Sequence, residues 1–194
     1  MPQRLLIFIT LLLVCSWSSA AEQSAEEIIR STTSEVLSRI TTDREEYQAR
    51  PERLQSLVRE LITPHFDFEI MSKQVLEQYW NQLKPEQQDC FVSGFGELLV
   101  KRYSHILNAY DNQTIRLEPE MPTDKPGYVM VKQILSKPGR PPLPIVYPFR
   151  ELEDGWKAVD LVIDNISLVT SYRQSFLYDI NQQGLETFLS SICP

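Results

Sequence analysis

Apolar residues recur at steps of three and four in the first half of the chain, which predicts helices there. Ser24 to Glu27 fits the capping box that opens many helices, and the apolar stripe that follows reaches Ile40. A second stripe begins after Pro51 and stops before Pro64, because the residue preceding a proline disfavours helical backbone. Asp67 is positioned to cap a short helix, and another short helix is predicted to follow up to Leu83.

The longest predicted helix begins at Pro85 and carries a wide apolar stripe that is rich in aromatic side chains. Its members recur at helical spacing: Phe91, Phe95, Leu98, Leu99, Tyr103, Ile106, Leu107 and Tyr110. Gly94 and Gly96 interrupt the stripe, which indicates either close packing or a bend.

Between Thr114 and Ile163 the apolar period changes to two, which predicts strands. Four segments alternate in this way: residues 114–118, 127–137, 143–152 and 156–163. Glu153-Asp154-Gly155 is a tight hairpin signal, and the meander order favours an antiparallel sheet. Asp164 or Asn165 is expected to cap a helix that ends at Gly184, and a last short helix reaches Ile192. The predicted class is α+β, with helices packed on a curved four-stranded antiparallel sheet.

Both faces of the middle strands are apolar over part of their length. Val129, Val131 and Leu135 lie on one side, and Met130 and Ile134 on the other. An antiparallel sheet with one wet face is apolar on one side only. We therefore expect each face to be covered, either by helices or, on one face, by an apolar ligand held between sheet and helices.

The first twenty residues have the order and length of a secretory signal peptide. Arg4 precedes a largely apolar run from Leu5 to Trp17, and small residues follow. The run is shorter than the roughly 20 residues of a membrane-spanning helix. We expect cleavage after Ala20 or Ala21, export to the periplasm, and one domain over residues 21–194. The alternatives are an uncleaved anchor and lipid attachment at Cys15, which the bulky Val14 disfavours.

Charge and cysteine content narrow the classes of partner. The chain carries a formal net charge of −7, which argues against nucleic acid as a partner and against electrostatic adhesion to anionic membranes. Cys90 and Cys193 remain after the leader, and an oxidising compartment allows either a disulfide between them or two unpaired thiols.

The sequence contains few residues that match the spacing of a known metal-binding or catalytic motif. His65, His105 and Cys90 do not have metal-ligand spacing, and no phosphate-binding glycine loop or nucleophile motif occurs. We therefore expect no catalytic residues, no metal site and no cofactor, and interpret the chain as a binding protein rather than an enzyme.

Three segments resemble one known family. Pro64-His65-Phe66-Asp67-Phe68-Glu69-Ile70-Met71-Ser72 is similar to a conserved segment of the MlaC-type proteins, the toluene-tolerance auxiliary components of an ABC transport system. The helix that starts at Pro85 resembles the helix that follows in that family. Gly155 to Asp160 together with Ser167 to Phe176 resembles its C-terminal signature, except that Asn165 stands where the family usually has glycine.

The resemblance implies a periplasmic carrier with glycerophospholipid as its cargo. In that family the lipid moves between an inner-membrane ABC complex, with its MCE-domain subunit, and an outer-membrane lipoprotein complex, which helps to keep the outer membrane asymmetric. We also expect the protein to be a monomer.

A lipid carrier needs an apolar pocket, because exposing two acyl tails to water costs of order 20 kcal/mol. The apolar stripes supply the candidate wall residues: Leu98, Leu99, Tyr103, Leu107, Val129, Val131, Tyr147, Phe149, Leu161, Val169, Tyr172 and Phe176. Arg173 either approaches the lipid phosphate or pairs with Asp160 or Asp164 to fix its helix on the sheet.

Two other classes remain open from the residues alone. One is a small hydrolase- or isomerase-like enzyme on a cone-shaped α+β fold, acting on an apolar molecule with His105 or an acid as base. The other is an interaction module with a solid core and no pocket.

Overall fold

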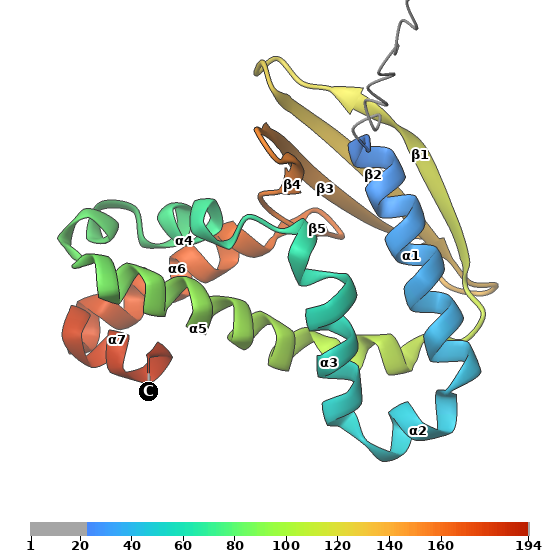
Figure 1. Cartoon of the computed structure of the whole chain (residues 1–194), viewed down its shortest axis with the longest axis horizontal. Coiled ribbons are helices and arrows are strands. Elements are labelled where there is room, and N and C mark those ends of the chain that lie inside the picture. The colour runs from blue at the N-terminus through green and yellow to red at the C-terminus, as the bar shows by residue number, and fades with distance from the viewer. Residues whose placement is uncertain (1–22, 194) are drawn as a thin grey trace, which may run out of the picture.

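The computed structural model describes residues 23–193, so the predicted signal peptide lies outside the described residues. Helices come first, strands follow, and helices close the chain, as the sequence predicted (Figure 1). The elements are α1 (Ala25–Thr42), α2 (Arg44–Ala49), α3 (Pro51–Leu61), η1 (Thr63–His65), α4 (Phe68–Leu76), η2 (Glu77–Gln82), α5 (Pro85–Tyr103), η3 (Ser104–Ala109), β1 (Thr114–Pro122), β2 (Tyr128–Ser136), β3 (Leu143–Leu152), β4 (Gly155–Ala158), β5 (Val162–Ile163), β6 (Ile166–Ser167), α6 (Leu168–Gln183) and α7 (Leu185–Ile192).

The strands form one antiparallel sheet in the order β1-β2-β3-β5-β6, with β4 also paired to β3. The predicted α+β class is confirmed, but the strand expected over residues 156–163 is divided into β4 and β5. Asp160 interrupts it, because its carboxylate accepts hydrogen bonds from the Leu161 and Val169 amides and from the Ser167 hydroxyl. A backbone amide that donates to a side chain is not available for a hydrogen bond to the neighbouring strand, so the strand ends there.

A tight turn joins β5 to β6 and places Asp164 and Asn165 at positive φ, 50° and 64°. Asn165 therefore adopts the left-handed backbone for which glycine is the usual residue. Neither residue caps α6. The cap is Ser167, whose hydroxyl accepts from the Thr170 amide at 3.0 Å, because the short strand β6 delays the start of the helix.

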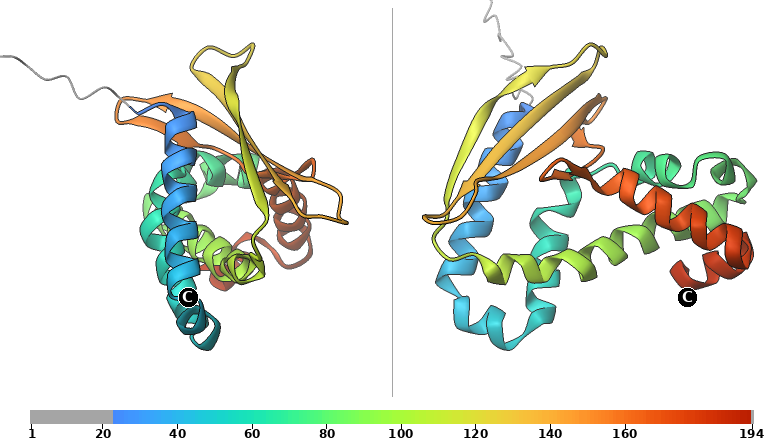
Figure 2. Two further views of the ribbon diagram at one scale, coloured as in Figure 1. Left: turned by 90° about the vertical axis from the view of Figure 1, so that its right-hand side faces the viewer. Right: turned by 180° about the vertical axis from the view of Figure 1, so that it is seen from behind.

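Helix α1 crosses one face of the sheet, and the other face carries no helix in the described part of the chain (Figures 1 and 2). The expectation that both faces are covered is therefore wrong. On the open face, Glu118 forms ion pairs with Lys132 at 3.3 Å and with Arg116 at 2.9 Å. These charges stand between apolar side chains such as Met130, which is 40% exposed, and they make the face compatible with water.

Helices α4 to α7 form a separate layer with its own aromatic core (Figure 2). Phe91, Phe95, Phe176 and Phe188 pack with ring centroids 5.0–6.2 Å apart. The long helix ends earlier than its stripe predicted, at Tyr103, and η3 continues as a tighter 3₁₀ helix. Across residues 23–193, none of the helices has the length and apolar character that a membrane crossing requires.

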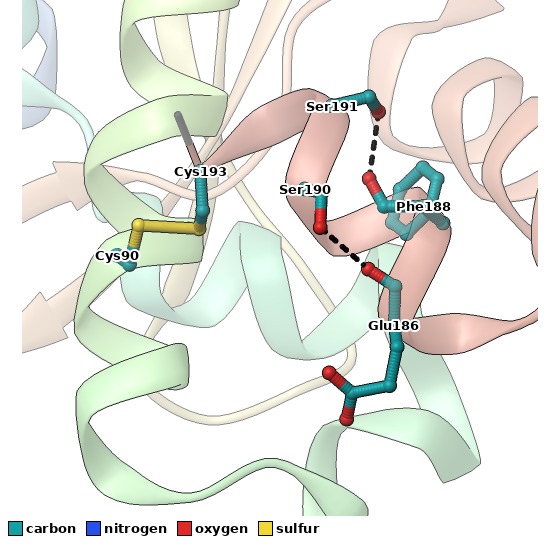
Figure 3. Close-up of a disulfide and its surroundings, with 6 residues drawn as sticks. All are labelled: Cys90, Glu186, Phe188, Ser190, Ser191 and Cys193. Carbon is teal, nitrogen blue, oxygen red and sulfur yellow. Dashed lines mark hydrogen bonds between the residues drawn. A yellow bond between two sulfur atoms is a disulfide. The ribbon is translucent and has the colours of Figure 1, made fainter.

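A disulfide between Cys90 and Cys193 ties α5 to the end of α7 (Figure 3). The Cα atoms are 5.7 Å apart, which is the usual distance for this bond. Gly94 explains how the two helices come so close, since a Cβ atom at this position would overlap the Ile192 carbonyl oxygen. The sequence left either close packing or a bend for Gly94, and the structure shows close packing.

Candidate functional site: an apolar cavity between helix and sheet

A cavity of about 330 Å³ lies between α1 and the inner face of the sheet. The apolar stripe of α1 forms one wall, through Ile28, Ile29, Val36, Leu37 and Ile40. These residues share one side of the helix because they recur at steps of three and four. The volume falls within the range of about 300–1,000 Å³ that is typical of ligand pockets.

The sheet and η3 complete the wall. The sheet contributes apolar side chains from β1, β2 and β3, and η3 with the residue after it closes one end: Ile115, Leu135, Leu143, Ile145, Tyr147, Ile106, Leu107, Ala109 and Tyr110. Within the part of the chain that the structure describes, the lining includes no Asp, Glu, Lys or Arg. A space of this kind favours hydrocarbon and excludes charge, because burying an unpaired charge is very costly.

One chain of hydrogen bonds crosses the cavity wall. The Tyr147 hydroxyl donates to Gln133 Oε1 at 2.9 Å, and Gln133 Nε2 donates to Thr33 Oγ1 at 2.7 Å. This chain links β3, β2 and α1. Gln133 is only 4% exposed, so the network satisfies a side chain that would otherwise be costly to bury. Burial also raises the pKa of Tyr147, so this phenol stays neutral.

Among residues 23–193, His65 is the histidine that lines the cavity. Burial lowers its pKa, and the nearby Lys157 cation lowers it further, so the imidazole is held in the neutral form. His105 is exposed on η3 and does not line the cavity. In residues 23–193, His, Cys, Asp and Glu side chains form no group of three that could hold a metal ion.

Two large apolar lining residues are exposed to solvent, Ile106 on η3 with 48% and Leu143 at the start of β3 with 36% of their surface. We infer that the cavity opens to solvent beside them. Large aliphatic side chains left in water beside an apolar cavity are typical of the entrance to a hydrophobic site.

A second, smaller hollow of about 90 Å³ adjoins the first. Its wall comes from α3, η1, α4 and α5 and from the segment around Leu161. Ile62 and Phe66 line both spaces and therefore stand between them.

The twelve predicted wall residues are distributed over several places. Leu107 and Tyr147 line the larger cavity; Leu99, Tyr103 and Leu161 line the smaller hollow; Leu98 lines an open groove on the outside of α5; Val129, Val131 and Phe149 lie in the core under the sheet; and Val169, Tyr172 and Phe176 lie in the helical core. Their contact with lipid stays a prediction.

Arg173 ties α6 to α4. Its Nε donates to the Gln74 carbonyl at 3.0 Å, and its guanidinium forms an ion pair with Glu77 at 3.3 Å. Of the two alternatives for Arg173, a structural role agrees with these contacts, but its partners are Glu77 and Gln74 rather than Asp160 or Asp164. The Asp160 carboxylate is engaged at the start of α6. The residue lines none of the cavities described above.

Sequence reasoning overlooked the contribution of α1. The helical stripe from Ile28 to Ile40 was recognised as apolar, but nothing in the sequence says which surface such a stripe faces. Thr32 and Thr33, small polar residues beside the stripe, also line the cavity.

This fold and this cavity define a class: a helix-and-sheet protein that encloses an uncharged, apolar space open to solvent at one end. The chain belongs to the MlaC family, whose model, described as MlaC protein, matches residues 30–192.

Related proteins agree with this assignment. The intermembrane phospholipid transport system binding protein MlaC of Haemophilus influenzae is 23% identical over 191 residues, which cover 97% of this chain and 89% of that protein. The toluene tolerance protein ttg2D of Pseudomonas putida is 22% identical over 167 residues, 86% of this chain and 77% of that one.

A solved structure has the same fold. The phospholipid-binding protein of Ralstonia solanacearum, determined in complex with a phospholipid, superposes with a TM-score of 0.77 at 26% identity, covering 87% of this chain and 96% of that chain. These proteins are named for binding, transport and tolerance rather than for a reaction. The predicted family and the prediction of a binding protein rather than an enzyme are confirmed.

Proposed function

We propose that this protein is a periplasmic carrier of glycerophospholipid whose acyl chains occupy the cavity between α1 and the sheet. The observation that carries the proposal is the absence of any Asp, Glu, Lys or Arg from the lining of a cavity of about 330 Å³. The Ralstonia solanacearum protein, which has this fold, was determined with a phospholipid bound.

The energetics favour this cargo over a small polar ligand. Burying one methylene contributes about 0.8 kcal/mol to binding, so the affinity for an acyl chain increases with the length of apolar wall that it contacts. The charged headgroup is expected to remain in water at the opening beside Ile106 and Leu143, because no lining residue can neutralise it.

The proposed route runs between two membranes. In this account the carrier exchanges lipid with an inner-membrane ABC complex through its MCE-domain subunit, and with an outer-membrane lipoprotein complex, and so supports outer-membrane lipid asymmetry. The name of the Haemophilus influenzae relative, an intermembrane phospholipid transport binding protein, supports this route. The net charge of −7 suits a carrier that must leave anionic membrane surfaces between encounters.

Lipid extraction tests the proposal with a matched pair of variants on α1. Leu37 lines the cavity, whereas Ser38 is exposed and does not. Leu37→Glu places a carboxylate in the cavity, and Ser38→Glu adds the same charge outside it. Organic extracts of the wild type and of Ser38→Glu should contain glycerophospholipid by mass spectrometry, and the extract of folded Leu37→Glu should contain much less. Absence of lipid from folded wild-type protein would oppose the proposal.

The compartment is tested separately, by sequencing the N-terminus of the protein released from the periplasm. The proposal predicts a chain that begins at Ala21 or Glu22. A chain that retains Met1 and remains with the membranes would contradict it.

No observation favours the enzyme alternative, since His105 lies outside the cavity and no acid lines it. The cavity itself argues against an interaction module with a solid core.

A further inference from the structure

Two side chains, Ile62 and Phe66, form a partition between the larger cavity and the smaller hollow. Phe66 also packs against both the helical core and the core under the sheet. The partition therefore stands where the two layers of the molecule meet, and its position decides whether the two spaces are separate or continuous.

The smaller hollow is suited to hydrocarbon. Its polar lining residues are Thr63 and Tyr103. Thr63 Oγ1 donates to the Arg59 carbonyl at 2.9 Å, so this hydroxyl already has a partner in the wall. The other lining residues except Tyr103 are apolar, and apolar cavities of this kind stay dry and take up apolar molecules.

The smaller hollow is too small to hold a lipid chain by itself. About 90 Å³ is room for only a few water-sized groups, each with a share of about 30 Å³. It can act only as an extension of the larger cavity, reached through the partition.

We propose that the smaller hollow receives the terminal carbons of an acyl chain held in the larger cavity, and that Phe66 and Ile62 set the chain length that the protein accepts. This inference rests on the proposed function. It assigns to the partition a role in selecting cargo by length.

The backbone at the partition is fixed while the ring is free of polar restraints. Phe66 forms a parallel bridge with Ala158, and the Asp67 amide donates to the Ala158 carbonyl at 2.9 Å. The ring stacks on Phe68 at 6.0 Å between centroids. The proposal therefore assigns the opening of the passage to rotation about the side-chain bonds of Phe66, with the backbone held in place.

The length of a single acyl chain is the variable that tests this role. Delipidated protein is titrated with a series of lysophosphatidylcholines that differ only in the length of one saturated chain. Affinity should rise roughly fourfold with each methylene that leaves water, and then stop rising at a limiting length. Phe66→Ala should move this limit to longer chains, and Phe66→Trp, which fills the passage, should move it to shorter ones.

Two further variants control for loss of packing. Ile62→Ala opens the other half of the partition and should also lengthen the limit. Val92→Ala removes a comparable apolar contact in the helical core, lines neither space, and should leave the limit unchanged. If Phe66→Ala does not fold, as judged by thermal unfolding, Phe66→Leu takes its place.

The outcomes separate the two proposals. If the folded wild type binds no lysophosphatidylcholine of any length, the proposed function fails. If it binds the series, but the limit is the same in the wild type, Ile62→Ala and both Phe66 variants, the partition has no selective role and only this inference is overturned.

Discussion

At the scale of single residues, the cavity combines an apolar lining with one satisfied polar network. The side chains of Tyr147, Gln133 and Thr33 are hydrogen-bonded to one another, so the buried amide of Gln133 already has partners and needs none from an acyl chain. Such a network is costly to break on one side, because the remaining partner stays buried without a hydrogen bond.

Removing both partners of the Tyr147–Gln133 hydrogen bond should destabilise the protein less than the two single truncations added together. Tyr147→Phe leaves Gln133 Oε1 without its donor and should lower the free energy of unfolding by about 1–3 kcal/mol. Gln133→Leu leaves the Tyr147 hydroxyl without its acceptor and should have a cost of the same order. Urea unfolding of the double variant should show a loss smaller than the sum of the two. Strictly additive losses would mean that the two side chains are not coupled.

His65 should make stability depend on pH in one direction. Burial and Lys157 lower its pKa in the folded protein, so the unfolded chain binds the proton more readily. Stability is then fully present above the unfolded pKa of about 6.5 and is lost as the pH falls toward the lower folded value. His65→Gln should flatten this part of a pH series of thermal unfolding. An equal slope in His65→Gln and wild type would contradict this.

At the scale of elements, the sequence predicted where segments begin better than what they pack against. Ser24 caps α1 and Pro51 and Pro85 open α3 and α5, as expected, because caps and prolines act locally. The division of the fourth strand at Asp160 depends on Ser167 and Val169. Contacts of this kind join residues that are separated along the chain, and periodicity does not record them.

The disulfide should carry a large share of the stability of α7. It joins residues 103 positions apart, and closing a loop of about 100 residues restricts the unfolded chain strongly. Cys193→Ser should lower the free energy of unfolding by roughly 2–5 kcal/mol, measured by urea unfolding. A reductant should weaken the wild type to a similar extent and leave Cys193→Ser unchanged. If the reductant weakens both proteins equally, the disulfide is not the cause.

At the scale of the whole molecule, the cavity lies between α1 and the sheet, beside the separate core of helices α4 to α7. The sequence identified the apolar stripes but not their pairing. The α6 residues Val169, Tyr172 and Phe176 were therefore assigned to the wall, although they lie in the helical core, while the α1 stripe was overlooked. An apolar stripe shows that a surface is buried, and only the arrangement of elements shows against what.

The mass of the intact, folded protein tests the central claim most directly. Native mass spectrometry of protein purified without detergent should show a species heavier than the chain by the mass of glycerophospholipid, and this added mass should disappear on delipidation. The same species should be strongly reduced in Leu37→Glu and retained in Ser38→Glu. A folded wild-type protein that carries no lipid, and takes none up from phospholipid vesicles, would contradict the account.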